Sequence, residues 1–120
     1  MARARILLVE DDATLARSVG RLLSLYVDVE YACSLSEALD ALAAAPRLDA
    51  VWSDRQLEGP NDGVDILVAA RSAHPDALLL LVTGTLEPKG LERLPADVVV
   101  MSKARTSAAT ELLLSRLAPA

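Results

Sequence analysis

The chain has 120 residues, of which 52% are apolar, and its formal net charge is −5 at pH 7. This length fits one domain with a single continuous core, and the apolar fraction excludes a disordered chain. The negative charge, which no cluster of Lys and Arg offsets, argues against a nucleic-acid-binding surface.

The cysteine content and the apolar runs indicate the compartment. Cys33 is the single cysteine, so it cannot form an internal disulfide, and this fits a reducing cytoplasm. The apolar runs are too short for a signal peptide or a membrane span. We therefore expect a cytoplasmic protein that does not insert into a membrane.

Short apolar runs alternate with helical patterns along the chain. The runs predict five strands, most of them apolar on both faces as buried parallel strands are: residues 6–9, 27–32, 49–52, 78–82 and 98–101. Apolar residues at helical spacing predict the helices between and after them: residues 15–26, 35–42, 64–73 and 106–117. Ser34, with Glu37 three residues later, forms a capping-box pattern at the second helix. Residues 86–94 make a poor helix because Pro88 and Gly90 interrupt them.

Five strands that alternate with five helical segments predict a three-layer α/β/α sandwich. We expect a five-stranded parallel sheet of order 2-1-3-4-5, the flavodoxin-like arrangement, with a short or irregular fourth helix. In such sheets the functional site lies beyond the carboxyl ends of the strands.

Acidic residues stand at two of these strand ends. Glu10 and Asp11 follow the first strand, and Asp54 ends the third, which the sheet order places beside the first. Two unit charges ~4 Å apart repel by roughly 4 kcal/mol at an effective dielectric constant near 20. A divalent cation removes that cost, and an all-oxygen ligand set suits Mg²⁺. Asp12, the third acid in the row, is expected to cap the first helix.

A hydroxyl and an ammonium group are expected to face the acids. Thr83 ends the fourth strand and Lys103 follows the fifth. Each of these residues has an ordinary interpretation when taken alone: a turn acid, a loop Asp, a helix cap or a solvated lysine. Four strand ends that each supply a residue of a suitable type are far more specific than any one member.

The motifs "ILLVEDD", "DAVWSD", "LLLVTG" and "VVVMSK" resemble those of the receiver domain of two-component response regulators. The resemblance covers residues 1–120 as one receiver domain. It implies that Asp54 is the phosphoacceptor, which takes a phosphoryl group from the phosphohistidine of a partner histidine kinase or histidine phosphotransfer protein. Such a domain catalyses only its own phosphorylation and dephosphorylation.

The same resemblance implies roles for the neighbouring residues. Asp11 corresponds to a direct Mg²⁺ ligand and Glu10 to a ligand that acts through water, beside Asp54 itself. The main-chain carbonyl of Gln56 corresponds to a further ligand. Lys103 corresponds to the cation that pairs with a phosphoryl oxygen, and Thr83 to the hydroxyl that moves to bind the phosphoryl group.

Some positions depart from the family pattern. Ala104 follows Lys103 where proline is usual, so we expect a trans peptide bond there. Val100 stands where an aromatic residue is common, which predicts an atypical output switch. We hypothesise that phosphorylation instead orders or shifts residues 84–94, and that a downstream protein, or a second copy in a homodimer, contacts this segment.

Other classes of protein remain as alternatives. One is a receiver-like interaction module that is never phosphorylated. A haloacid-dehalogenase-type phosphatase would need a second Asp at the position of Gln56. A flavodoxin-type protein would need a phosphate-binding loop after the first strand, where "EDD" is electrostatically hostile to phosphate.

Three further residues have ordinary structural interpretations. His74, the only histidine, precedes Pro75 and is expected at a surface helix terminus. Cys33 is expected to be a small core or loop residue. Trp52 is expected to pack in the core, close enough to Asp54 along the strand to report on the site by fluorescence.

Overall fold

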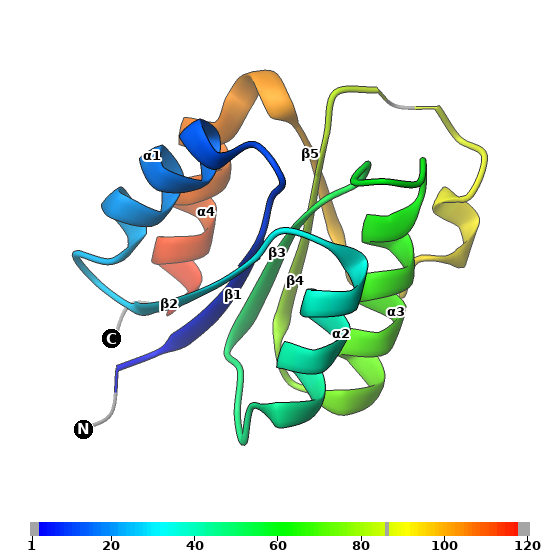
Figure 1. Ribbon diagram of the computed structural model, residues 1–120. Coiled ribbons are helices and arrows are strands. Elements are labelled where there is room, and N and C mark those ends of the chain that lie inside the picture. Colours follow the sequence, from blue (N-terminus) through cyan, green and yellow to red (C-terminus); the bar gives the residue numbers. More distant parts are fainter. Residues whose placement is uncertain (1–2, 86, 118–120) are drawn as a thin grey trace.

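The computed structural model describes residues 3–85 and 87–117, which form a five-stranded parallel sheet with helices on both faces (Figure 1). The strands follow the order β2-β1-β3-β4-β5, and each pairs in parallel with its neighbours. Their bounds are β1 Arg5–Val9, β2 Asp28–Ala32, β3 Ala50–Asp54, β4 Leu78–Thr83 and β5 Val99–Ser102. The predicted sheet order is therefore confirmed.

Two helices cover each face of the sheet. Helices α1 (Ala13–Leu23) and α4 (Thr106–Leu117) lie on one face, and α2 (Leu35–Ala44) and α3 (Asp62–Ala73) lie on the other (Figure 1). A 3₁₀ turn, η1 (Leu91–Arg93), is the helical structure described between β4 and β5, and a second one, η2 (Lys103–Arg105), leads into α4. The expected irregular fourth helix is thus confirmed for the residues that the structure describes.

The strands are apolar on both faces because each face meets a helical layer. In β1, Ile6 and Leu8 pack toward α1 and α4, whereas Leu7 and Val9 pack toward α2 and α3. Trp52 of β3 is 2% exposed and packs with Ile6 and Leu8 on the side of α1 and α4, so its predicted place in the core is confirmed. Successive residues of a strand point to opposite faces, which explains why the apolar runs are continuous.

The start of α1 matches the sequence-based expectation. The Asp12 carboxylate accepts hydrogen bonds from the backbone N–H groups of Thr14 at 3.0 Å and Leu15 at 3.1 Å. This satisfies two of the donors that a helix leaves unpaired at its first turn. Asp12 is therefore a helix cap, as predicted.

The capping box at α2 is only half formed. The Ser34 hydroxyl accepts from the Glu37 N–H at 3.1 Å. The Glu37 carboxylate accepts from the backbone N–H of Cys33 at 3.2 Å, one residue before the partner that a complete box requires. Cys33 itself is exposed in this loop, and its thiol lies 3.2 Å from Glu37 Oε2. That hydrogen bond, followed by the charge of Glu37, raises the pKa of the Cys33 thiol.

His74 corrects the sequence-based expectation. It ends α3, as expected, but its side chain is 8% exposed and not at the surface. Its Nε2 lies 2.9 Å from the main-chain oxygen of Leu42 in α2. The ring therefore joins the two helices of one layer and is a buried structural residue.

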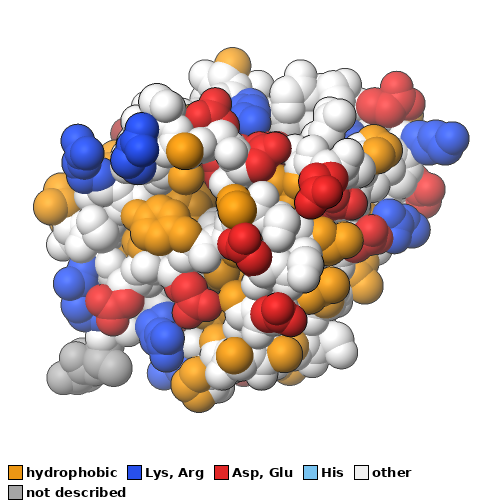
Figure 2. All heavy atoms as spheres, viewed as in Figure 1, with side chains coloured by type: hydrophobic (Ala, Val, Ile, Leu, Met, Phe, Trp, Pro, Cys, Tyr) orange, Lys and Arg blue, Asp and Glu red, His pale blue; other side chains and the backbone are white. Residues whose placement is uncertain are grey.

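One face of the molecule carries scattered acidic side chains among polar and apolar ones. Figure 2 shows Asp and Glu side chains spread over the face viewed, with Lys and Arg mainly toward its margins. No continuous basic patch is visible on that face among the described residues. Among residues 3–85 and 87–117, no helix is both long and apolar enough to span a membrane.

Candidate functional site

Three carboxylates meet where β1 and β3 end. Glu10 and Asp11 directly follow β1, and Asp54 is the last residue of β3, its neighbour in the sheet. One carboxylate oxygen from each lies within 4.8 Å of the others. Glu10 and Asp54 are 5% and 4% exposed, and Asp11 is exposed. The predicted convergence of these acids is thus present in the structure.

The crowding perturbs Glu10. Burial, and the neighbouring Asp54 carboxyl group, raise its pKa from 4.5 to about 7. The backbone N–H of Asp12, 3.2 Å from Glu10 Oε2, and the charge of Lys103 partly oppose this rise. A carboxyl group whose pKa is raised to near 7 by burial and a like charge is typical of a site that binds a cation or does chemistry.

Lys103 supplies the positive charge that faces the acids. Its Nζ donates to Asp54 Oδ2 at 3.0 Å and lies 3.4 Å from Glu10 Oε1. Burial lowers the pKa of Lys103, but the hydrogen bond to Asp54 and the charges of both acids more than offset this, so the pKa is raised. The described residues contain no cis peptide bond, so the bond to Ala104 is trans, as expected.

A hollow of about 470 Å³ opens beside the phosphoacceptor candidate, and its walls include Asp54, Asp11, Gln56, Thr83 and Lys103. The backbone N–H of Gln56 lies 3.4 Å from Asp54 Oδ1, so this residue is at the rim of the acidic group. Predicted residues from four strand ends therefore share one cavity, whereas Glu10 is not among its walls.

The Thr83 hydroxyl is hydrogen-bonded to the nearby main chain of Thr85. Its hydroxyl donates to the main-chain oxygen of Thr85 at 2.6 Å and accepts from the Thr85 N–H at 3.1 Å. The side chain is 3% exposed and lines the hollow. To donate a hydrogen bond to a group in the hollow, the hydroxyl has to leave the Thr85 carbonyl, because it has only one proton to donate.

The acidic group fits a hard divalent cation. Three carboxylates within reach of one another offer oxygen ligands, and Lys103 pairs with only two of them. A Mg²⁺ ion uses one or two carboxylates and retains several waters, which the adjoining hollow can hold. The residues present therefore suit Mg²⁺.

Arg55 lies next to the site, where it contacts the Thr85 main chain that lines the hollow, and sequence reasoning missed it. It follows Asp54 directly, and its side chain is 3% exposed. Its guanidinium group donates to Asn61 Oδ1 at 3.0 Å and to the main-chain oxygens of Thr85 at 3.3 Å and Lys89 at 2.8 Å. The available signal was its position directly after Asp54, next to the end of a buried strand.

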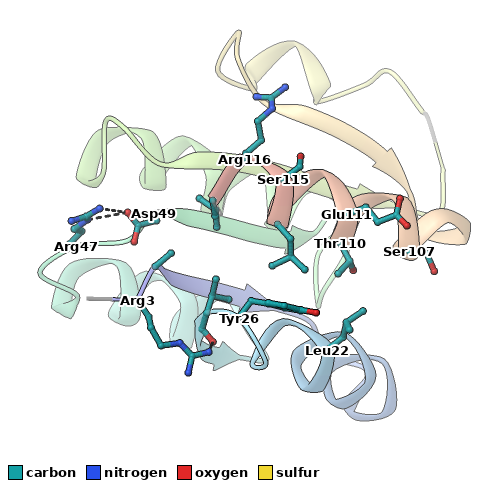
Figure 3. Close-up of a pocket in the computed structure, with 14 residues that line it drawn as sticks. Arg3, Leu22, Tyr26, Arg47, Asp49, Ser107, Thr110, Glu111, Ser115 and Arg116 are labelled. Atoms are coloured by element: carbon teal, nitrogen blue, oxygen red, sulfur yellow. Dashed lines mark hydrogen bonds and ion pairs between the residues drawn. The ribbon is translucent and has the colours of Figure 1, made fainter. Parts of the chain in front are cut away.

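A larger hollow of about 1040 Å³ lies between α1 and α4 (Figure 3). Leu22, Tyr26 and Leu114 are among its walls, and the ion pair of Arg47 with Asp49, 2.6 Å apart, stands at one end. None of the three converging acids lines it. The smaller hollow is the better candidate site, because Asp11, Asp54 and the Lys103 ammonium that pairs with Asp54 line it.

Comparison with known proteins supports the fold. No family model and no curated protein matches the chain. A response regulator receiver protein from Sinorhizobium medicae WSM419 is 24% identical, with 96% of this chain and 94% of that chain covered and a TM-score of 0.83. The receiver domain of the hybrid histidine kinase CckA is 25% identical, with 95% and 99% covered and a TM-score of 0.76.

A third structure carries ligands. It is a response regulator from Burkholderia pseudomallei with a phosphorylated aspartic acid, a calcium ion and citrate, 18% identical, with 96% of this chain and 73% of that chain covered and a TM-score of 0.73. The fold and site by themselves define a flavodoxin-like α/β protein with an acidic site at its strand ends. These matches identify the fold as that of response-regulator receiver domains.

Proposed function

We propose that residues 1–120 form a phosphorelay receiver domain that accepts a phosphoryl group on Asp54. The observation that carries this proposal is the position of the Asp54 carboxylate. It lies within 4.8 Å of two further carboxylates and 3.0 Å from the Lys103 ammonium, at the wall of an open hollow. Phosphoryl transfer requires this combination of an oxygen nucleophile and concentrated positive charge.

The donor is the phosphohistidine of a partner histidine kinase or histidine phosphotransfer protein. In the transfer, a carboxylate oxygen of Asp54 forms the new O–P bond. The N–P bond of the phosphohistidine breaks, and the histidine nitrogen keeps its electron pair. The product is an acyl phosphate, which is labile because a carboxylate is a good leaving group.

Other residues of the site support this step. Glu10, Asp11, Asp54 and the main-chain carbonyl of Gln56 would hold Mg²⁺, which supplies positive charge to the phosphoryl oxygens. Lys103 exchanges its contact with Asp54 for one with a phosphoryl oxygen. Thr83 donates its hydroxyl proton to another phosphoryl oxygen, since the new dianion demands donors.

The partners and location follow from the same proposal. A cytoplasmic receiver passes its state to a downstream protein or to a second copy in a homodimer, and it catalyses only its own phosphorylation and dephosphorylation. We assign no nucleic-acid or membrane partner to this domain. We place the response to phosphorylation in residues 84–94.

A second candidate function is a receiver-like interaction module that is not phosphorylated. The exposed Val100, at a position where the family commonly has an aromatic residue, favours it, because this side chain offers no ring to move inward. The described part of the β4–β5 connection, which contains only a 3₁₀ turn, favours it as well. The intact acidic group and its lysine favour phosphorylation.

One experiment separates the two functions. The protein is incubated with Mg²⁺ and phosphoramidate, a small donor with the same N–P bond, and its intact mass is measured. We expect the mass of one phosphoryl group to be gained by the wild type and by Asp40→Asn, a matched change on the exposed face of α2, but not by Asp54→Asn. Uptake that persists in Asp54→Asn would refute the assignment, and no uptake by the wild type would favour the interaction module.

A further inference from the structure

Arg55 is a buried cation with no carboxylate partner among the described residues. Its side chain is 3% exposed, and its three guanidinium nitrogens contact neutral oxygens: Asn61 Oδ1 and the main-chain oxygens of Thr85 and Lys89. Burying an unpaired charge is unfavourable, and only charge-assisted hydrogen bonds offset the cost here. An apolar side chain would fill this space without that cost. We therefore infer that the guanidinium group is needed for the three contacts that it makes.

The group connects the phosphoacceptor candidate to two other segments. The Arg55 backbone N–H donates to Val82 in β4 at 3.0 Å, and its carbonyl accepts from Gly63 in α3 at 2.8 Å. A Cβ at Gly63 would lie 2.1 Å from the Asp54 main-chain oxygen, so α3 approaches this strand end as closely as a glycine allows. The backbone of Arg55 is thus fixed, while its side chain reaches the chain that follows β4.

The main-chain oxygen of Thr85 is the point where Arg55 meets the proposed chemistry. It accepts hydrogen bonds from both the Thr83 hydroxyl, at 2.6 Å, and Arg55 Nη1, at 3.3 Å. If Thr83 turned to a phosphoryl group on Asp54, this carbonyl would lose one of its two donors. A partly buried carbonyl left without a donor is costly, and Arg55 prevents that loss.

The contact with Lys89 extends the link beyond the hollow. Arg55 Nη2 donates to its main-chain oxygen at 2.8 Å, four residues after Thr85. Gly90, the next residue, has φ 96°, and a Cβ there would lie 2.5 Å from Asn61 Nδ2, a side chain that also contacts Arg55. One guanidinium group therefore holds the β4–η1 connection at two points against the residue that precedes α3.

We propose that Arg55 is a positioning residue. It allows the Thr83 hydroxyl to move its donated hydrogen bond from the Thr85 carbonyl to the phosphoryl group, and it couples this change to residues 87–94. The proposal rests on the phosphoacceptor role of Asp54 given above. Arg55 keeps the Thr85 carbonyl paired in both states, and any shift of that carbonyl is passed to Lys89 through the same rigid planar group.

The test uses beryllofluoride with Mg²⁺ as a phosphoryl mimic. Wild type, Arg55→Leu, Arg55→Lys and the control Arg71→Leu are compared. Arg71 is a matched control because it also binds main-chain oxygens, those of His74, Pro75 and Ala77, but at the other end of α3. Affinity is read from Trp52 fluorescence, the local response from hydrogen exchange, and stability from urea unfolding.

We expect Arg55→Leu to bind the mimic about tenfold more weakly, the scale of one unsatisfied hydrogen-bonding group. The mimic should then no longer slow exchange in residues 87–94. Arg55→Lys keeps the charge but cannot reach three acceptors at once, so both effects should be intermediate. Arg71→Leu should lose stability but retain the wild-type affinity and exchange response.

Two results would overturn the proposal. One is wild-type affinity and exchange response in Arg55→Leu with only a loss of stability, which would make Arg55 a structural clamp. The other is an equal loss of response in Arg71→Leu. If Arg55→Leu does not fold, Arg55→Lys decides by the same criteria. If the wild type takes up phosphate on Asp54 but Arg55→Leu binds and responds to the mimic as the wild type does, the proposed function stands and only the role of Arg55 is refuted. If the wild type takes up neither phosphate nor the mimic, both the proposed function and the role of Arg55 are refuted.

Discussion

Two adjacent acids, Asp11 and Asp12, have different tasks in this structure. Asp11 lies with Glu10 and Asp54 in the acidic group, whereas the Asp12 carboxylate is used on the first turn of α1. The difference arises because the chain turns after β1 and the next helix begins at Ala13. Of two identical side chains one position apart, one therefore joins the acidic group and the other caps a helix.

Substitution of each acid should separate these tasks. Asp11→Ala should weaken Mg²⁺ binding and change stability little, because this side chain is exposed and carries no cap. Asp12→Ala should lower the free energy of unfolding by about 1 kcal/mol, the usual value of an N-cap, and leave Mg²⁺ binding near that of the wild type. Metal titration and urea unfolding of both variants measure this. Equal effects on metal affinity would show that the pair is wrongly assigned.

Glu10 gives the metal-free protein a pH dependence of known sign. Folded chains keep a proton on Glu10 up to about pH 7, whereas unfolded chains lose it near pH 4.5. The unfolded state thus binds fewer protons in this window, so the free energy of unfolding should fall as the pH rises from about 4.5 to 7. Mg²⁺ needs the ionised carboxylate, so its affinity should rise over the same window.

Chelator-treated protein followed by urea unfolding from pH 4.5 to 8 measures this effect. Glu10→Gln should flatten the fall, and Glu111→Gln, a matched change on the exposed side of α4, should leave it as in the wild type. A fall of equal size in Glu10→Gln would place the titrating group elsewhere.

At the scale of the elements, the helical layer of α2 and α3 depends on a buried histidine. The contact of His74 Nε2 with the Leu42 carbonyl joins the end of α3 to α2. His74→Ala should lower the free energy of unfolding by about 1–3 kcal/mol, because the carbonyl loses its partner and the ring leaves a gap. Urea unfolding measures the loss, and phosphoryl uptake should persist. A neutral effect on stability would return His74 to the surface position that the sequence suggested.

The β4–β5 connection should be the segment that responds to the site. Its described part has a single 3₁₀ turn, and its contacts with the rest of the chain include the Arg93–Asp65 ion pair and Arg55. Elements with few such contacts open readily, so residues 87–94 should exchange amide hydrogens quickly in the free protein. Beryllofluoride with Mg²⁺ should slow this exchange. Identical exchange in both states, with a response in another region, would contradict this mechanism.

The sequence predicted those features whose signal is local or repeated. The apolar runs gave five strands, and the position of Asp12 before an apolar helical pattern gave the cap. The sheet order followed from the alternation of strands and helices, since few arrangements can bury strands that are apolar on both faces. The acidic group then followed from strand ends that the order brings together.

The features that the sequence did not predict depend on contacts between distant segments. His74 is buried because α2 packs beside it, and nothing near Pro75 signals that contact. The partners of Arg55 are mostly main-chain oxygens, which every residue carries and which leave no pattern in residue types. The Glu37 contact with the Cys33 N–H depends on the path of a loop.

At the scale of the whole molecule, the fold separates a scaffold from a site. The sheet and its two helical layers hold four strand ends in one place, and residues from these ends form the site. The solved structures reported above share this fold at 18–25% identity. The β4–β5 connection lies at the edge of this scaffold (Figure 1), and its Leu91, Leu94 and Val98 pack against one core cluster as partly buried residues.

The central claim is that Asp54 is the residue that takes up phosphate. The most direct measurement is to treat the protein with Mg²⁺ and phosphoramidate, convert the acyl phosphate to a hydroxamate with hydroxylamine, and locate the modified residue by peptide mass spectrometry. We predict a hydroxamate on Asp54 alone, absent when a chelator removes the metal. Modification at Glu10 or Asp11 in place of Asp54, or modification that needs no metal, would contradict the account.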